Sequence, residues 1–163
     1  MKKICIMSSI IIINFIFQTS LYNFAGIFGV VPNISLIFVV IFAMMTNSIL
    51  GGIFGILTGM LFDMMLQDVF GIYTLIFFIV GGVIGSFSED VNRENYMLYA
   101  VSSMLATAFM HFALFIILFF LKYKVENSYY ILGNIVLEII LNTILSIIVL
   151  KFVEFSFKKL NLK

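Results

Sequence analysis

The sequence predicts an all-α, polytopic integral membrane protein with six transmembrane helices and both termini in the cytoplasm. Hydrophobic residues make up 63% of the 163-residue chain and charged residues only 10%. Soluble domains contain roughly 45–50% hydrophobic residues and about 25% charged residues. No residue from Ile4 to Phe62 carries a formal charge, although a water-facing surface of that length needs several charges. Lysine and arginine also gather in the segments predicted for one side of the membrane. Lipid is therefore the solvent that this chain requires.

The first predicted span covers residues 4–21. Lys2 and Lys3 before an apolar run resemble the start of a secretory signal. The run ends without a small-x-small cleavage pattern, and more apolar segments follow it, so we interpret it as an uncleaved span. Cys5 lies in this run and is interpreted as a small apolar filler, since one cysteine forms neither a disulfide framework nor a metal cluster.

Spans two to four are separated by short segments rich in turn-forming residues. Residues 22–33 contain several Asn and Gly residues and the only proline, Pro32, which predicts a loop. Thr46-Asn47-Ser48 predicts a tight turn, and a further break begins at Gln67. These breaks predict spans over residues 33–46, 49–66 and 72–87. The second is short for a crossing helix, which needs about 20 residues, so it could also be re-entrant.

Two charged segments bound the last two spans. Residues 88–95 form the most charged loop of the chain, and residues 122–128 carry two lysines and a glutamate. Neither segment can lie in hydrocarbon. The sequence therefore predicts spans over residues 96–121 and 129–150, a basic tail after the last span, and a single membrane domain over residues 1–163.

The distribution of lysine and arginine predicts the orientation, because short cytoplasmic loops are enriched in them. Six spans place Lys122 and Lys124 alone on one side and the other basic residues on the opposite side. A five-span arrangement would separate the two basic termini and is disfavoured. The net charge of +1 indicates no nucleic-acid partner. The cytoplasmic set is Lys2, Lys3, Arg93, Lys151, Lys158, Lys159 and Lys163.

The third and fourth spans carry glycines at helical spacing. Gly51, Gly55 and Gly59 are each four residues apart, and Asp63 continues the series. Glycines on one helix face let two backbones approach closely, which is how helices associate when lipid removes the hydrophobic driving force. Gly81 and Gly85 repeat the spacing on the next span. We predict a packing seam between spans three and four, and a second interpretation is that the same face receives a helix of a partner protein.

Two aspartates lie near the turn between these spans. Asp63 is near the end of the third span, and the fourth helix begins just past Gly71, where its first N–H groups have no partner within the helix. We predict that the Asp63 carboxylate binds these groups and that Asp68 caps the same turn. This contact would fix the connection between the two helices.

Polar residues also form stripes on the last two spans. Asn134, Glu138 and Asn142 recur every four residues on the sixth span, and the fifth carries His111 at a depth similar to that of Glu138. Pairing of His111 with Glu138 could lock the two helices together. An ionisable group inside a membrane bundle can instead mark a transport or ligand site. Both interpretations remain open at this point.

Sequence signatures of catalysis are absent. The chain contains no H-E-x-x-H, G-x-S-x-G or P-loop sequence and no Cys/His metal spacing. The sequence therefore predicts a protein that is not an enzyme and that uses no cofactor or metal.

One extended motif resembles a known family. Gly55-x3-Gly59-x3-Asp63-x7-Gly71, followed by Ile72-Tyr73-Thr74-Leu75, is similar to the central signature of the rod shape-determining MreD family. A short basic N-terminus and a second span entered through Pro32 agree with this family. Family members often carry an acidic residue after that proline, and this chain has Asn33.

The resemblance implies a scaffold subunit of the bacterial cell-elongation complex, located in the inner membrane. Its implied partners are MreC by direct contact, the MreB filaments, the RodA glycosyltransferase and a class B penicillin-binding protein, so its implied role is in peptidoglycan synthesis and cell shape. The alternative that we consider is the substrate-binding membrane subunit of an energy-coupling-factor vitamin transporter. Such a subunit would use Asn134, Glu138, Asn142 and His111 to hold its substrate.

Overall fold

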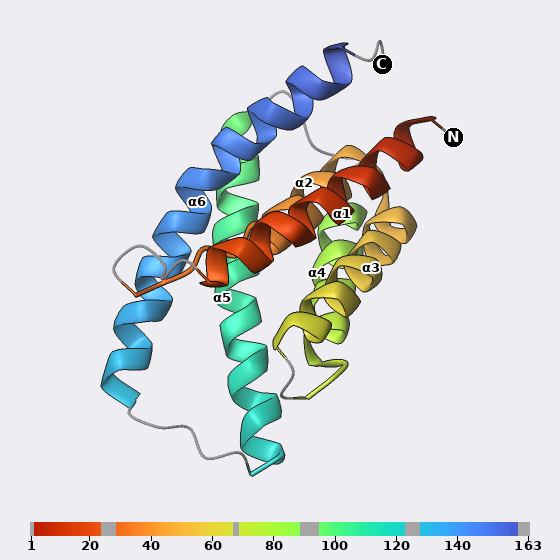
Figure 1. The fold of residues 1–163 in the computed structure, drawn as a ribbon. Coiled ribbons are helices and arrows are strands. Elements are labelled where there is room, and N and C mark those ends of the chain that lie inside the picture. The colour runs from red at the N-terminus through yellow and green to blue at the C-terminus, as the bar shows by residue number, and fades with distance from the viewer. Residues whose placement is uncertain (1, 24–28, 67–68, 89–94, 123–127, 160–163) are drawn as a thin grey trace.

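The computed structural model describes residues 2–23, 29–66, 69–88, 95–122 and 128–159, and these residues form six α-helices (Figure 1). The predicted all-α fold is confirmed. The helices are α1 (Lys2–Asn23), α2 (Ile34–Met45), α3 (Ser48–Leu66), α4 (Ile72–Phe87), α5 (Tyr96–Phe120) and α6 (Ser128–Lys159).

Three of the helices are long and apolar enough to cross a membrane within the described residues. These are α3, α5 and α6, with apolar windows over Ser48–Met65, Tyr96–Phe120 and Leu132–Lys159. Shorter apolar stretches lie in α1, α2 and α4. The six predicted segments are therefore all helical, while their six crossings stay a prediction.

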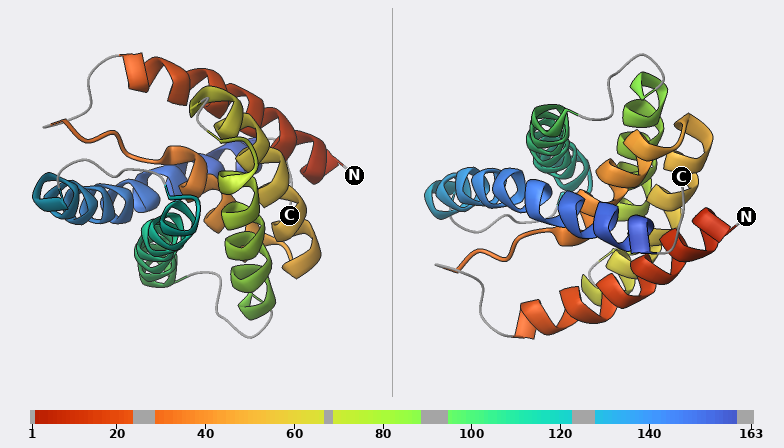
Figure 2. Two further views of the ribbon diagram at one scale, coloured as in Figure 1. Left: turned by 90° about the horizontal axis from the view of Figure 1, so that it is seen from below. Right: turned by 90° about the horizontal axis from the view of Figure 1, so that it is seen from above.

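The short helix α2 occupies the centre of the molecule. It packs against each of the other five helices, and every residue from Ile34 to Met44 is buried. Figure 2 shows it with α1 on one side, the α3–α4 pair on another and the α5–α6 pair on a third. A helix that is apolar on all faces is stable only when it is surrounded. Its 12 residues extend about 18 Å, which is less than the hydrocarbon thickness of about 30 Å.

Four of the other helices form two antiparallel pairs beside this centre. α3 and α4 pack along their full length, and α5 packs against α6. The first turn of α1 and the last turn of α6 lie at the same end of the molecule (Figure 1). This placement agrees with the prediction that both termini lie on one side of the membrane.

Two features differ from the sequence predictions. α6 continues to Lys159, past the predicted end of the span at residue 150, because Val153 and Phe157 keep its inner face apolar and buried. All seven tyrosines lie near predicted span ends, which predicts their rings at the headgroup level. Tyr99 is nevertheless only 1% exposed and belongs to the core.

Candidate functional site

The predicted glycine seam joins α3 to α4 at backbone contact. A Cβ atom at Gly59 would lie 2.5 Å from the Thr74 Cα, and one at Gly85 would lie 2.6 Å from the Asn47 carbonyl oxygen. At Gly55 the added atom would overlap the Phe77 carbonyl group. Real side chains do not tolerate such distances, so the two helices can pack this closely only with glycine at these positions.

The same geometry bears on the second interpretation, in which the glycine face of α3 receives a helix of a partner protein. Gly51 and Gly81 face each other, and a Cβ on either residue would overlap the carbonyl oxygen of the other. All five seam glycines, Gly51, Gly55, Gly59, Gly81 and Gly85, are buried. Because α4 already covers this face of α3, it is not open to a helix of another protein.

The Asp63 carboxylate binds the start of α4, as the sequence predicts. Its Oδ2 accepts hydrogen bonds from the N–H groups of Gly71 at 2.9 Å and Thr74 at 3.0 Å, and from the Thr74 hydroxyl at 2.6 Å. Its Oδ1 accepts from the Tyr73 N–H at 2.9 Å. Gly71 has φ of +105° at the N-cap of α4, a conformation that glycine adopts without strain. Asp68, predicted to cap the same turn, lies outside the described residues.

Polar side chains from four helices meet at the start of α2 and form what we call the buried polar layer. Asn142 of α6 accepts a hydrogen bond from the Asn33 N–H at 2.9 Å and donates one to the Thr107 hydroxyl of α5 at 3.1 Å. Gln18 of α1 donates to the Pro32 carbonyl and accepts from the Ile34 N–H, both at 3.0 Å. The layer comprises Asn14, Gln18, Asn33, Ser103, Thr107 and Asn142, each at most 4% exposed.

These contacts satisfy the free backbone groups of a helix that begins inside the protein. Asn33 caps α2 by accepting a hydrogen bond from the Leu36 N–H at 2.9 Å, and its amide nitrogen donates to the Met110 sulfur at 3.3 Å. Asn14 donates to the Ser35 hydroxyl at 2.9 Å. Non-helical backbone at membrane depth is stable only where protein groups replace water as partners. The layer is therefore what allows the chain to enter α2 at its buried position.

The predicted pair of His111 and Glu138 connects α5 to α6. The His111 Nε2 lies 3.0 Å from the Glu138 Oε2, and the two side chains are 20% and 15% exposed. The third member of the predicted stripe, Asn134, is exposed. The stripe thus changes from exposed Asn134 to fully buried Asn142 along α6, because the helix diverges from the core toward its first turns.

Sequence reasoning missed Asn14 and Gln18 as members of the layer. Both are polar residues on an apolar helix, and that is the signal that could have found them, but the partners of Gln18 lie 14 and 16 positions away along the chain. Spacing along one helix carries no information on a contact of this kind.

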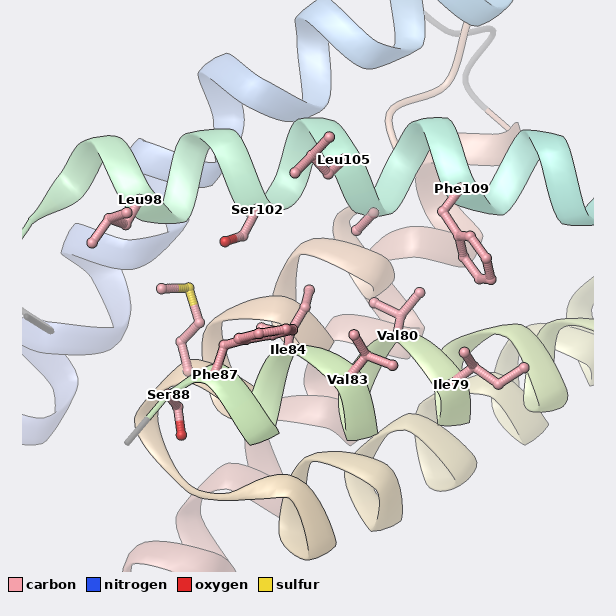
Figure 3. Close-up of a pocket in the computed structure, with 12 residues that line it drawn as sticks. Ile79, Val80, Val83, Ile84, Phe87, Ser88, Leu98, Ser102, Leu105 and Phe109 are labelled. Atoms are coloured by element: carbon pink, nitrogen blue, oxygen red, sulfur yellow. The ribbon is translucent and has the colours of Figure 1, made fainter. Parts of the chain in front are cut away.

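A groove lies between α4 and α5 (Figure 3), and Met44 of α2 is also among its lining residues. Its volume is about 350 Å³, and Ile79, Val83 and Phe109 are among its lining residues. The two serines of the lining are Ser88 and Ser102, and the Ser88 hydroxyl already donates to the Gly85 carbonyl at 2.8 Å. The groove therefore offers apolar contact and little chemistry. Within the described residues, no group of three or more His, Cys, Asp or Glu side chains could hold a metal ion.

Comparison with known families agrees with the resemblance seen in the sequence. The model of the rod shape-determining protein MreD matches residues 1–156. The chain belongs to the MreD family. The matched range includes the whole glycine seam, Asp63 and the buried polar layer. MreD proteins are membrane proteins that determine rod shape, which agrees with the three long apolar helices. No curated protein and no solved structure matches this chain.

Proposed function

We propose that this protein is a non-enzymatic scaffold subunit of the bacterial cell-elongation complex. In this role it crosses the inner membrane several times, binds MreC directly, and links the MreB filaments to peptidoglycan synthesis by RodA and a class B penicillin-binding protein. The observation that carries the proposal is the family match over residues 1–156.

The interior of the molecule supports a structural role. The polar side chains of the buried polar layer bond to one another and to the backbone at the start of α2. Asp63 is likewise used to bind four donors of α4. Groups committed to such hydrogen bonds hold helices in place and leave little capacity for binding a polar substrate.

Partner contacts in this proposal use the outer faces of the helices, since α4 covers the glycine seam. The energy-coupling-factor alternative gains no support from the comparisons. The residues predicted to hold its substrate also do not share one environment. Asn142 is fully buried within the buried polar layer, whereas Asn134 is exposed.

The test is depletion of the protein in its host, with cell shape followed by microscopy. We expect rods to become round and swollen over several generations and to recover when the wild-type gene is expressed. Pull-down of the tagged protein should recover MreC. Unchanged rods after confirmed depletion would contradict the proposed role, and rounded cells without MreC recovery would contradict only the proposed partner.

A further inference from the structure

A second and larger groove lies between α1 and α6, with α2 as its floor. Among the described residues, no Cα of α1 lies within 8 Å of a Cα of α6, and the space between the two helices has a volume of about 780 Å³. Its walls include Ile10 and Ile13 of α1, Phe38 of α2, and Ile148 and Phe152 of α6. Volumes of this size accommodate a small molecule or part of a lipid.

The length of the groove corresponds to one leaflet of a bilayer. Its lining on α6 runs from Leu145 to Ser156, which is about 16 Å along the helix axis. Half of the hydrocarbon core is roughly 15 Å thick. A transmembrane helix of another protein needs the full thickness, so the groove suits a single acyl chain better than a crossing helix.

The two ends of the groove differ in character. Asn14 lines the end of the groove away from the termini, and its amide oxygen is buried without a hydrogen-bond partner among the described residues. At the other end, Lys159 follows Ser156 by one helical turn, and Lys151, Lys158 and Lys159 are all exposed. α1 also begins at this end of the molecule (Figure 1), and its first turn contains two lysines.

The one described carboxylate of this part of α6 lies on the side away from the groove. Glu154 lies between Lys151 and Lys158 in the sequence and accepts a hydrogen bond from the Tyr96 hydroxyl of α5 at 3.2 Å. With about 3.6 residues per turn, Lys151 and Lys158 lie on the same side of α6 as Glu154. Lys159 lies instead on the side that lines the groove, three residues past Ser156, and it is exposed.

We infer that the groove between α1 and α6 binds one acyl chain of an anionic phospholipid, whose phosphate is held by Lys159. The apolar walls take up the chain, and Lys159 interacts with the phosphate, as basic residues beside a membrane helix do with anionic lipids. The occupied leaflet is the one at the end where both termini lie.

The test is native mass spectrometry of the purified full-length protein, titrated with palmitoyl-oleoyl phosphatidylglycerol or with phosphatidylcholine of the same chains. We expect phosphatidylglycerol to bind more tightly. The K159Q variant should weaken its binding by about fivefold. The matched control is K122Q, which removes a lysine just past the last turn of α5, at the opposite end of the molecule, and should leave binding unchanged.

A second pair of variants tests the acyl-chain part of the inference. Ile148 lines the groove and is 58% exposed, whereas Ile144 lies one turn earlier on α6, is 55% exposed and does not line it. Ile148→Trp should fill the groove and abolish the preference for phosphatidylglycerol, and Ile144→Trp should retain it. Both positions are exposed, so both variants should fold, and thermal unfolding would verify this.

Three outcomes would overturn the inference. Equal binding of the two lipids would remove the role of Lys159. Equal losses in K159Q and K122Q would show a general charge effect. Unchanged binding in Ile148→Trp, with the protein folded, would place the lipid elsewhere on the surface.

Discussion

Asp63 carries a carboxyl group and is only 3% exposed. Its Oδ2 serves three donors and its Oδ1 serves one. In the Asp63→Asn variant the amide nitrogen can replace only one of these oxygens, and it would best face the single Tyr73 N–H. We expect a loss of ~1–2 kcal/mol in the free energy of unfolding, plus a smaller loss of charge interaction with the helix start.

The prediction for Asp63 is measured by thermal unfolding in detergent. Asp63→Ala removes all four hydrogen bonds and should be destabilised more than Asp63→Asn. The Thr74→Val variant removes only the hydroxyl donor of Thr74, so we expect a smaller loss of stability than in Asp63→Ala. Equal unfolding temperatures for wild type and Asp63→Ala would show that the carboxylate does not hold the turn.

Asn142 stabilises the buried polar layer through two hydrogen bonds, as Asp63 stabilises the start of α4. Replacing it by leucine leaves the Asn33 N–H and the Thr107 hydroxyl without the partner that each has at 2.9 and 3.1 Å. An unsatisfied buried polar group costs about 1–3 kcal/mol, so Asn142→Leu should lower the unfolding temperature clearly. Asn134→Leu, an exposed change of the same kind on the same helix, is the control and should have little effect. Similar losses in both variants would contradict a special role for the layer.

At the scale of elements, most of the fold could be predicted from the sequence. Six apolar runs separated by Pro, Gly, Asn and charged residues were enough to predict six helices, and the four-residue spacing of Gly51 to Gly59 predicted the seam. The central position of α2 could not be predicted. Lipid and protein interior are both apolar, so a helix surrounded by other helices and one facing lipid have similar compositions. The sequence of α2 is apolar on every face in either case.

The contacts of Gln18 in the buried polar layer could not be predicted from the sequence either. A stripe on one helix can be predicted from spacing, and so His111 could be matched in depth with Glu138. The hydrogen bonds of Gln18 to Pro32 and Ile34 depend instead on how the chain returns after α1. That path is set by the packing of α2 against the other helices, which no local pattern in α1 reports.

Because α3 and α4 pack so closely, we predict opposite effects of alanine substitution at Gly55 and at Gly82. Gly55→Ala places a methyl group against the Phe77 carbonyl, whereas the position of a Cβ at Gly82 is free of neighbours within 4 Å. Gly55→Ala should therefore separate the two helices and lower both the unfolding temperature and the level of protein in the membrane. Gly82→Ala should be neutral or slightly stabilising, by up to about 1 kcal/mol, because alanine favours helix more than glycine does.

These two variants are compared at equal expression, by thermal unfolding and by quantification of the membrane fraction. Since both replace glycine with alanine on a helix of the same pair, they differ chiefly in what the methyl group meets. A Gly55→Ala protein as stable as Gly82→Ala would mean that α3 and α4 are not in backbone contact.

At the scale of the whole molecule, the topology is defined by the side of the membrane on which each helix end lies. α5 has 25 residues, about 37 Å, which exceeds the hydrocarbon thickness of about 30 Å. Its first residue, Tyr96, contacts Glu154 near the end of α6, so α5 begins at the end of the molecule that holds both termini. Lys122, just past the last turn of α5, must then lie at the opposite end.

This arrangement predicts opposite labelling of two engineered cysteines. In a Cys5→Ser background, Lys122→Cys should react with a membrane-impermeant maleimide added to intact spheroplasts, and Lys159→Cys should react only after the membrane is permeabilised. Both positions are exposed in the structure, so a lack of reaction reports on the membrane and not on burial. This orientation is predicted from the excess of lysine and arginine in the segments assigned to the side of the termini, since such residues are retained in the cytoplasm. Labelling of both cysteines in intact spheroplasts would contradict a crossing by α5, and labelling of Lys159→Cys alone would reverse the orientation.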